Sequence, residues 1–298
     1  METLTLDQIA AKVDARQPLT ADETEQLAGT SDIIALGVLA DRVRRQRHAT
    51  RVTFVRVAEV SLADAANGVA TWPASAREIR IVGRPPSFEE ARGAVRALAV
   101  GAGPIPLTGF SLSDFECLAA GDPAVLVRQL GFLRDEGLTL LAEARVDEVR
   151  DLAGALRAAD RAGLPVACIT VGAPTPGGPT HLIRRLDDVL STGATISAFA
   201  PLPRQPGPEP TTGYEDVKAV ALARILLPID HIQVDWRLHG PKLAQVALTF
   251  GADDVQNVAA EDETKEGWRR SAREEILRNI HAAGFEPAER DGRFVLLD

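Results

Sequence analysis

The feature that most constrains the fold of this chain is the alternation of strand-like and helix-like segments between residues 51 and 250. Short apolar runs typical of strands fall at 51–58, 78–83, 104–109, 138–144, 165–171, 195–201 and 231–238. Helical periodicity falls at 61–68, 87–100, 111–118, 122–136, 146–162, 179–191, 213–227 and 240–250. Strands that alternate with helices pair in parallel through right-handed crossovers. The pattern therefore predicts an α/β fold built on a parallel sheet.

The last predicted strand favours a barrel over an open sheet. One of its faces is apolar, and the other carries His231, Gln233, Asp235, Arg237 and His239. A parallel strand of an open sheet is apolar on both faces, because helices cover both. A barrel strand instead turns one face to the helices and the other to the lumen. We therefore expect a TIM-type (β/α) barrel with its functional site where the strands end.

Several segments resemble a known enzyme family. They are 36–48, 51–56 (RVTFVR), 212–218 (TGYEDVK), 221–224 (ALAR), 242–254 (KLAQVALTFGADD) and 283–291 (AGFEPAERD). Together they resemble the radical-SAM enzymes of the futalosine route to menaquinone, namely aminofutalosine synthase, cyclic dehypoxanthine futalosine synthase and, more distantly, the FO synthases that form deazaflavin. The resemblance runs from about residue 30 to the C-terminus, although 60–165 match only in pattern. It implies a radical-SAM-like barrel.

The chain departs from this family where the cofactor would bind. The family carries Cys-x-x-x-Cys-x-x-Cys after its first strand, but residues 57–68 contain no cysteine, and the whole chain has only Cys117 and Cys168. In that family these three thiolates hold the cluster, and two distant cysteines cannot supply such a ligand set. The Gly-Gly pair that contacts S-adenosylmethionine in the family is replaced here by Gly83-Arg84. From these departures we expect no cofactor: no 4Fe-4S cluster, no S-adenosylmethionine and no radical chemistry, as in a pseudoenzyme.

The organisation expected from the sequence is one globular unit. An N-terminal helical extension (1–50) precedes the barrel (51–258), and a C-terminal helix and hairpin (259–298) turn at Asp291-Gly292. A net charge of -9 argues against a nucleic-acid binder, which needs clustered cations. Neither a signal peptide nor an apolar run of membrane-spanning length is evident, so we expect a cytoplasmic protein without membrane contacts.

Strand alternation gathers polar side chains in the predicted lumen. The candidates for ligand binding are Arg56, Glu59, Arg84, Arg145, Thr170, Gln233 and Arg237. Because carboxylates and guanidiniums would face one another there, two interpretations are open. Paired charges either fill the lumen as a salt-bridged plug or surround a small-molecule pocket.

The sequence does not identify catalytic residues. Glu143 or Asp235 with His239 is a candidate acid/base pair, but no nucleophile or oxyanion element accompanies it. His231, Asp235 and His239 cannot share one metal ion from an extended strand, since two four-residue steps span about 26 Å. We therefore predict no metal site and leave catalysis undetermined.

The function predicted from these observations is binding rather than radical catalysis. We expect a paralogue of the menaquinone enzymes that works as a binding, scaffold or regulatory subunit. Its expected partner is an active radical-SAM paralogue of the same pathway or a second copy of the chain, and a small-molecule ligand is also open. The alternative is an iron-independent enzyme or small-molecule-binding protein whose polar lumen takes a nucleoside-like or polar aromatic ligand.

Overall fold

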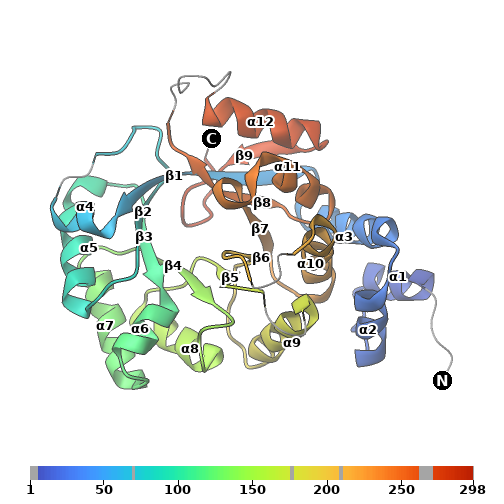
Figure 1. Ribbon diagram of the computed structural model, residues 1–298, viewed down its shortest axis with the longest axis horizontal. Coiled ribbons are helices and arrows are strands. Elements are labelled where there is room, and N and C mark those ends of the chain that lie inside the picture. Colours follow the sequence, from blue (N-terminus) through green and yellow to red (C-terminus); the bar gives the residue numbers. More distant parts are fainter. Residues whose placement is uncertain (1–5, 69–70, 175–177, 208–210, 262–270, 298) are drawn as a thin grey trace.

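The computed structural model shows a closed barrel of eight parallel strands, and it describes residues 6–68, 71–174, 178–207, 211–261 and 271–297 (Figure 1). The barrel strands are β1 (Arg51–Ser61), β2 (Glu78–Val82), β3 (Leu107–Ser111), β4 (Leu140–Arg145), β5 (Ile169–Val171), β6 (Ala198–Pro203), β7 (His231–Asp235) and β8 (Asp254–Ala259). Neighbouring strands follow chain order, and β1 closes the ring by pairing with both β2 and β8. The predicted TIM-type barrel is thus confirmed.

Helices surround this barrel on the outside (Figure 1). They are α4 (Leu62–Ala66), α5 (Phe88–Ala102), α6 (Leu112–Leu118), α7 (Pro123–Asp135), α8 (Leu152–Ala162), α9 (Gly178–Ser191), α10 (Gly213–Leu226) and α11 (Trp236–Thr249). Several begin where a side chain caps the first turn, as Thr212 and Glu215 do in a capping box for α10. Their inward residues and the outer faces of the strands form one continuous apolar core.

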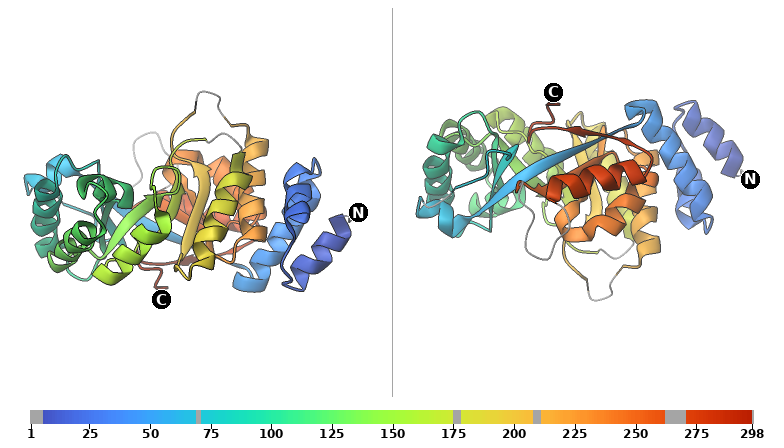
Figure 2. Two further views of the ribbon diagram at one scale, coloured as in Figure 1. Left: turned by 90° about the horizontal axis from the view of Figure 1, so that it is seen from below. Right: turned by 90° about the horizontal axis from the view of Figure 1, so that it is seen from above.

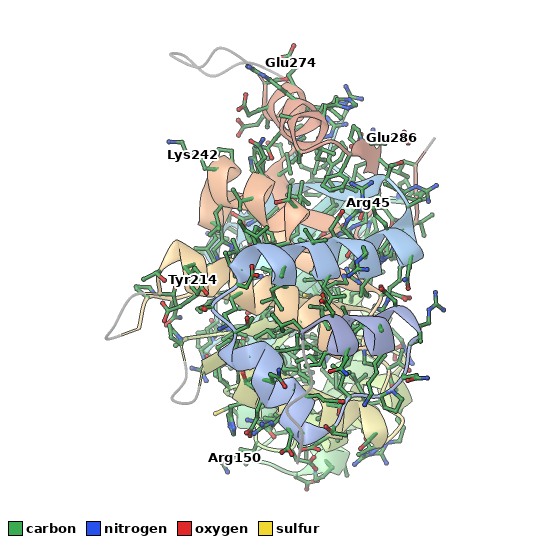
Figure 3. All side chains as sticks on the ribbon, turned by 90° about the vertical axis from the view of Figure 1, so that its right-hand side faces the viewer. Arg45, Arg150, Tyr214, Lys242, Glu274 and Glu286 are labelled. Carbon is green, nitrogen blue, oxygen red and sulfur yellow. The ribbon has the colours of Figure 1, made fainter. Side chains whose placement is uncertain are left out.

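Three helices precede the barrel: α1 (Leu6–Asp14), α2 (Ala21–Gly29) and α3 (Ile33–His48). Figure 3 shows α3 lying across one side of the barrel, with Arg45 near its end. The ring of Phe250, just after α11, packs against Gly37 so closely that a Cβ there would lie 2.8 Å from the ring. This close approach fixes α3 to the outside of the barrel.

The structure corrects the boundary of the strand predicted at 231–238. The strand ends at Asp235, whose carboxylate caps α11 by accepting hydrogen bonds from the backbone amides of Arg237 (3.0 Å) and Leu238 (2.9 Å). A capping carboxylate starts a helix because it satisfies amide groups that have no partner in the first turn. Arg237 and His239 therefore lie on a helical turn and not on a strand face.

The sequence prediction missed the eighth strand. Its lumen-facing positions are polar, and Asn257 has a φ of 62° that interrupts the alternation. The register with β1 shifts there, from Phe54 opposite Val255 to Arg56 opposite Val258. Such a bulge breaks the period of two from which a strand is recognised.

The C-terminal segment closes the end of the barrel where the strands begin. After α12 (Ala272–Ala282), β9 (Glu286–Glu289) pairs in parallel with β1, and the chain turns back so that Arg290 and Leu296 form an antiparallel bridge. The ring of Phe294 stacks on that of His231, the first residue of β7, at 4.8 Å between centroids. Figure 2 shows the chain end at this side of the barrel, which we call the floor.

Within the described residues, no helix combines the length and the apolar character needed to span a membrane. This finding concerns helices alone.

Candidate functional site

Polar side chains gather at the opposite end of the barrel, where the strands end. We call the group formed by Glu143, Arg145, Thr170, Arg204, Asp235 and Asn257 the mouth cluster. Its members come from β4, β5, β7 and β8 and from the residue that follows β6. The sites of β/α barrels lie at this end because the loops there converge over the lumen.

Glu143 is the centre of the mouth cluster. Its carboxylate accepts hydrogen bonds from Arg145 Nε (2.8 Å) and Thr170 Oγ1 (3.1 Å), and it lies 2.7 Å from Arg204 Nε. Only 8% of Glu143 is exposed. A buried carboxylate needs such partners, because without them its charged form loses the solvation that water supplies.

Arg204 joins the two acidic candidates. Its Nη1 donates to Asp235 Oδ2 at 3.3 Å while its Nε faces Glu143. Asn257 Nδ2 lies 3.4 Å from both oxygens of Asp235. The guanidinium therefore bridges the ends of β4 and β7 across the lumen.

The surroundings of the mouth cluster shift the pKa of Arg145 and of the neighbouring Asp114. Burial alone lowers the pKa of Arg145, but Glu143 and Glu148 more than offset this, so its pKa is raised. Burial raises the pKa of Asp114, and Arg145 and Arg84 oppose that shift. The pKa values of these groups therefore depend on the charged groups beside them.

The remaining candidates from the sequence lie apart from the mouth cluster. Arg84 is largely exposed and lies 3.2 Å from Asp114, and Arg237 pairs with Glu59 at the rim. Arg56 is buried against Glu289 on β9, at 2.6 Å. Thus Arg84, Glu59 and Arg237 border the mouth, whereas Arg56 belongs to the contact between β1 and β9.

Gln233 faces the floor and not the mouth. Its Nε2 donates to Asp254 Oδ2 at 2.6 Å, and the same carboxylate accepts from Arg290 Nε (2.6 Å) and Nη2 (2.7 Å). Thr53 Oγ1 donates to its other oxygen. We call Thr53, Gln233, Asp254 and Arg290 the floor cluster.

The structure does not bring together the predicted acid/base pair. His239 Nε2 lies 3.2 Å from the carbonyl oxygen of Pro203, and no hydrogen bond or ion pair in the described residues joins His239 to Glu143 or Asp235. The prediction placed Asp235 and His239 on one strand face and Glu143 on another strand lining the same lumen, but the strand of Asp235 ends at that residue. The correction follows from the helical turn that begins there.

Sequence analysis missed Arg204, Asn257 and Arg290. Arg204 is the first charged residue after the sixth predicted strand, at the end of the barrel where the functional site was expected, so its position could have indicated its role. Asn257 lies on the strand that was not predicted. Arg290 lies in the predicted terminal hairpin, but nothing in that pattern indicated that its side chain enters the barrel.

The comparisons with known proteins agree on the family resemblance. Residues 205–298 match the CofH/MqnC C-terminal region. The chain is 25% identical to 5-amino-6-(D-ribitylamino)uracil–L-tyrosine 4-hydroxyphenyl transferase of Methanothermobacter thermautotrophicus, over 92% of this chain and 93% of that protein. Aminodeoxyfutalosine synthase and cyclic dehypoxanthine futalosine synthase of Streptomyces coelicolor are 38% and 32% identical, but the matches cover only 24% and 30% of those enzymes.

Solved structures confirm the fold. Methylornithine synthase (PylB) superposes with a TM-score of 0.67 at 16% identity, covering 94% of this chain and 97% of that one. The hydrogenase maturase HydG gives 0.66 at 14% identity, covering 95% and 75%. At these identities the likeness concerns the barrel alone.

The comparisons contradict the prediction that no cofactor is expected. The relatives and the two matching folds are radical-SAM enzymes, a class that binds a 4Fe-4S cluster and S-adenosylmethionine, so that prediction is corrected. The thiols of this chain nevertheless do not fit the ligand set of such a cluster. Cys117 is exposed on α6, whereas Cys168 is buried against Ala198, Ala200 and Phe294. We therefore derive no catalytic step through a cluster.

Proposed function

We propose that this chain, a relative of the radical-SAM enzymes of the futalosine route to menaquinone, acts as a binding or regulatory subunit related to that route. The observation that carries the proposal is the bridge from Glu143 through Arg204 to Asp235. These groups lie where a barrel enzyme holds its reactive groups. Here they are engaged with one another, and the histidine expected to complete an acid/base pair points to a carbonyl instead.

The same network supports a polar ligand at the mouth. A ligand that entered would have to replace the partners of Glu143 and Asp235, since a buried carboxylate left alone is costly. Hydrogen-bond donors and acceptors of a nucleoside-like or polar aromatic molecule meet this requirement, and a purely apolar molecule does not. Arg84 and Arg237 border the mouth with mostly exposed side chains and are positioned to contact such a molecule as it enters.

The first test is binding, measured with the full-length protein. We expect saturable calorimetric binding of futalosine-type nucleosides or S-adenosylmethionine, weakened at least tenfold in Arg204→Ala and in the milder Thr170→Val. Arg161→Ala is the matched control, because Arg161 lies exposed on α8. If Arg204→Ala and Thr170→Val bind the ligand as tightly as the wild type, or if the wild type does not bind it, the mouth cluster is not the ligand site.

A second measurement addresses catalysis directly. The protein is purified and reconstituted without oxygen, its iron and sulfide are measured, and cleavage of S-adenosylmethionine is followed. Stoichiometric iron together with cleavage would overturn the proposed binding role and return the chain to radical enzymology. Mixing with an active relative of the pathway then tests the partner, and a change in the turnover of that enzyme is the expected result.

A further inference from the structure

A second cluster of chemistry-bearing side chains lies outside the barrel mouth. His48 ends α3, His231 begins β7 and Asp253 immediately precedes β8. One ligand atom from each lies within 4.8 Å of the other two. Three chain segments far apart in sequence thus bring two imidazoles and a carboxylate to one point near the floor.

One oxygen of Asp253 is the meeting point. Its Oδ2 lies 2.6 Å from His231 Nδ1 and 3.4 Å from His48 Nε2. Tetrahedral ligands about 2.0–2.1 Å from a zinc ion are themselves roughly 3.3 Å apart. The contact between Asp253 and His48 matches this spacing, and the contact between Asp253 and His231 would have to lengthen by about 0.7 Å. The two imidazole nitrogens, which lie within 4.8 Å of each other, would have to approach to about the same spacing, so a rotation of one ring is needed as well.

The other carboxylate oxygen of Asp253 is fixed by contacts with the protein interior. Its Oδ1 accepts from the Ile232 amide at 2.8 Å and pairs with the guanidinium of the fully buried Arg224. Ligating carboxylates in metal proteins are oriented by such outer contacts. Arg224 and Ile232 therefore leave Oδ2 facing the two histidines.

The site is open to solvent on the side of the histidines. Their side chains are 18% and 19% exposed and stack on each other at 5.1 Å between centroids. The carbonyl oxygen of Asp230 lies 2.8 Å from His48 Nε2 and offers a fourth ligand atom beside the two nitrogens and the carboxylate oxygen. An ion can thus enter from solvent between the two histidines, and the buried carboxylate of Asp253 lies behind them as the third ligand.

We propose that His48, His231 and Asp253 form a binding site for a divalent transition-metal ion, of which Zn²⁺ fits best. Two imidazoles and one carboxylate are a ligand set that Zn²⁺ takes in proteins, whereas Ca²⁺ and Mg²⁺ prefer oxygen alone. The ion would replace the direct contact between His231 Nδ1 and Asp253 Oδ2. It would tie α3 to the starts of β7 and β8, and its role would be structural and independent of the function proposed above.

The test uses full-length protein freed of metal by chelation and dialysis. Competition with a chromophoric zinc indicator is expected to show one tight equivalent per chain, and Co²⁺ is expected to give the visible bands of a tetrahedral site. His48→Gln and His231→Gln should each weaken binding at least tenfold, since even outer-shell changes weaken metal sites about 10–100-fold. The matched control is His181→Gln with His281→Gln, which removes two histidines outside the site.

Stability gives an independent readout. Zn²⁺ should raise the melting temperature of the wild type and of the control variant, because a ligand that binds only the folded state stabilises it. His48→Gln should lose this rise while keeping a wild-type circular dichroism spectrum in chelator. The proposal fails if the wild type takes up no tight equivalent, or if the control loses binding to the same extent as the His48 and His231 variants.

Discussion

At the scale of single residues, the two thiols illustrate how position determines reactivity. Cys117 is exposed on α6, whereas Cys168 is 3% exposed and packs against Ala198, Ala200 and Phe294. Burial raises the pKa of Cys168 to about 12, so the reactive thiolate is nearly absent there at neutral pH. Neither a shared disulfide nor a shared metal is suggested by these environments.

This contrast predicts selective alkylation. Iodoacetamide at pH 8 should modify Cys117 within minutes and leave Cys168 unmodified in the folded protein, since only the former is accessible. Peptide mapping by mass spectrometry measures both sites. The control is the same reaction in urea, where both should react. Equal labelling of the two thiols under native conditions would contradict the buried position of Cys168.

At the scale of elements, the sequence carries most of the barrel but not all of it. Seven strands were predictable because apolar runs recur between amphipathic helices, a pattern that burial in a parallel sheet requires. Residues 236–238 were wrongly assigned to the strand because their alternation continues its pattern, while the capping bonds from Asp235 that start α11 depend on local geometry. The strand β8 was not recognised because the bulge at Asn257 interrupts the two-residue alternation of the strand.

The candidate site was predictable to a similar degree. Glu143, Arg145, Thr170 and Asp235 were placed at the lumen from alternation alone, and the structure joins them through contacts of Glu143 and Arg204. Pairing across the barrel depends on which strand ends lie opposite, and a sequence without a structure does not give that. For the same reason the convergence of His48, His231 and Asp253 could not be seen, because their elements meet only in three dimensions.

An ion-pair network between helices predicts a dependence on pH. Glu136, after α7, accepts from Arg92 and Arg96 of α5, and the hydrogen bond from Arg96 is the main cause that lowers the pKa of Glu136 to about 2. Because the pKa of Glu136 is lower in the folded protein, its ionised carboxylate stabilises the fold at any pH above its unfolded pKa of about 4.5. This stabilisation is lost as the pH falls towards the folded pKa of about 2.

Glu136→Gln should therefore lower the urea midpoint at pH 7, and the difference from the wild type should shrink between pH 4.5 and pH 2. Asp135→Asn is the control, because its ion pair with Arg134 is exposed on both sides and contributes little. A difference for Glu136→Gln that stays constant over this range of pH would show that the ion pairs are not its cause.

At the scale of the whole molecule, the two ends of the barrel are built differently. Side chains at or just after the ends of the strands form the mouth cluster, whereas the C-terminal segment supplies the floor through Arg290 and Phe294. The guanidinium of Arg290 lies over the Phe294 ring, 3.9 Å from its centroid. The C-terminal segment therefore supplies both the cation that pairs with Asp254 and the ring that packs on that cation. Arg290 and Phe294 therefore belong to the packing of the barrel.

This arrangement predicts that Arg290 contributes far more to stability than its neighbour Arg293. Arg290→Ala leaves the fully buried carboxylate of Asp254 without its cation, and removing one partner of a buried pair costs about 3–5 kcal/mol. Arg293→Ala removes a half-exposed ion pair with Asp291 and should cost under about 1 kcal/mol. Urea unfolding of both variants gives the two values. Similar values would show that the floor is not held by the buried pair, and that the tail only covers a barrel already stable without it.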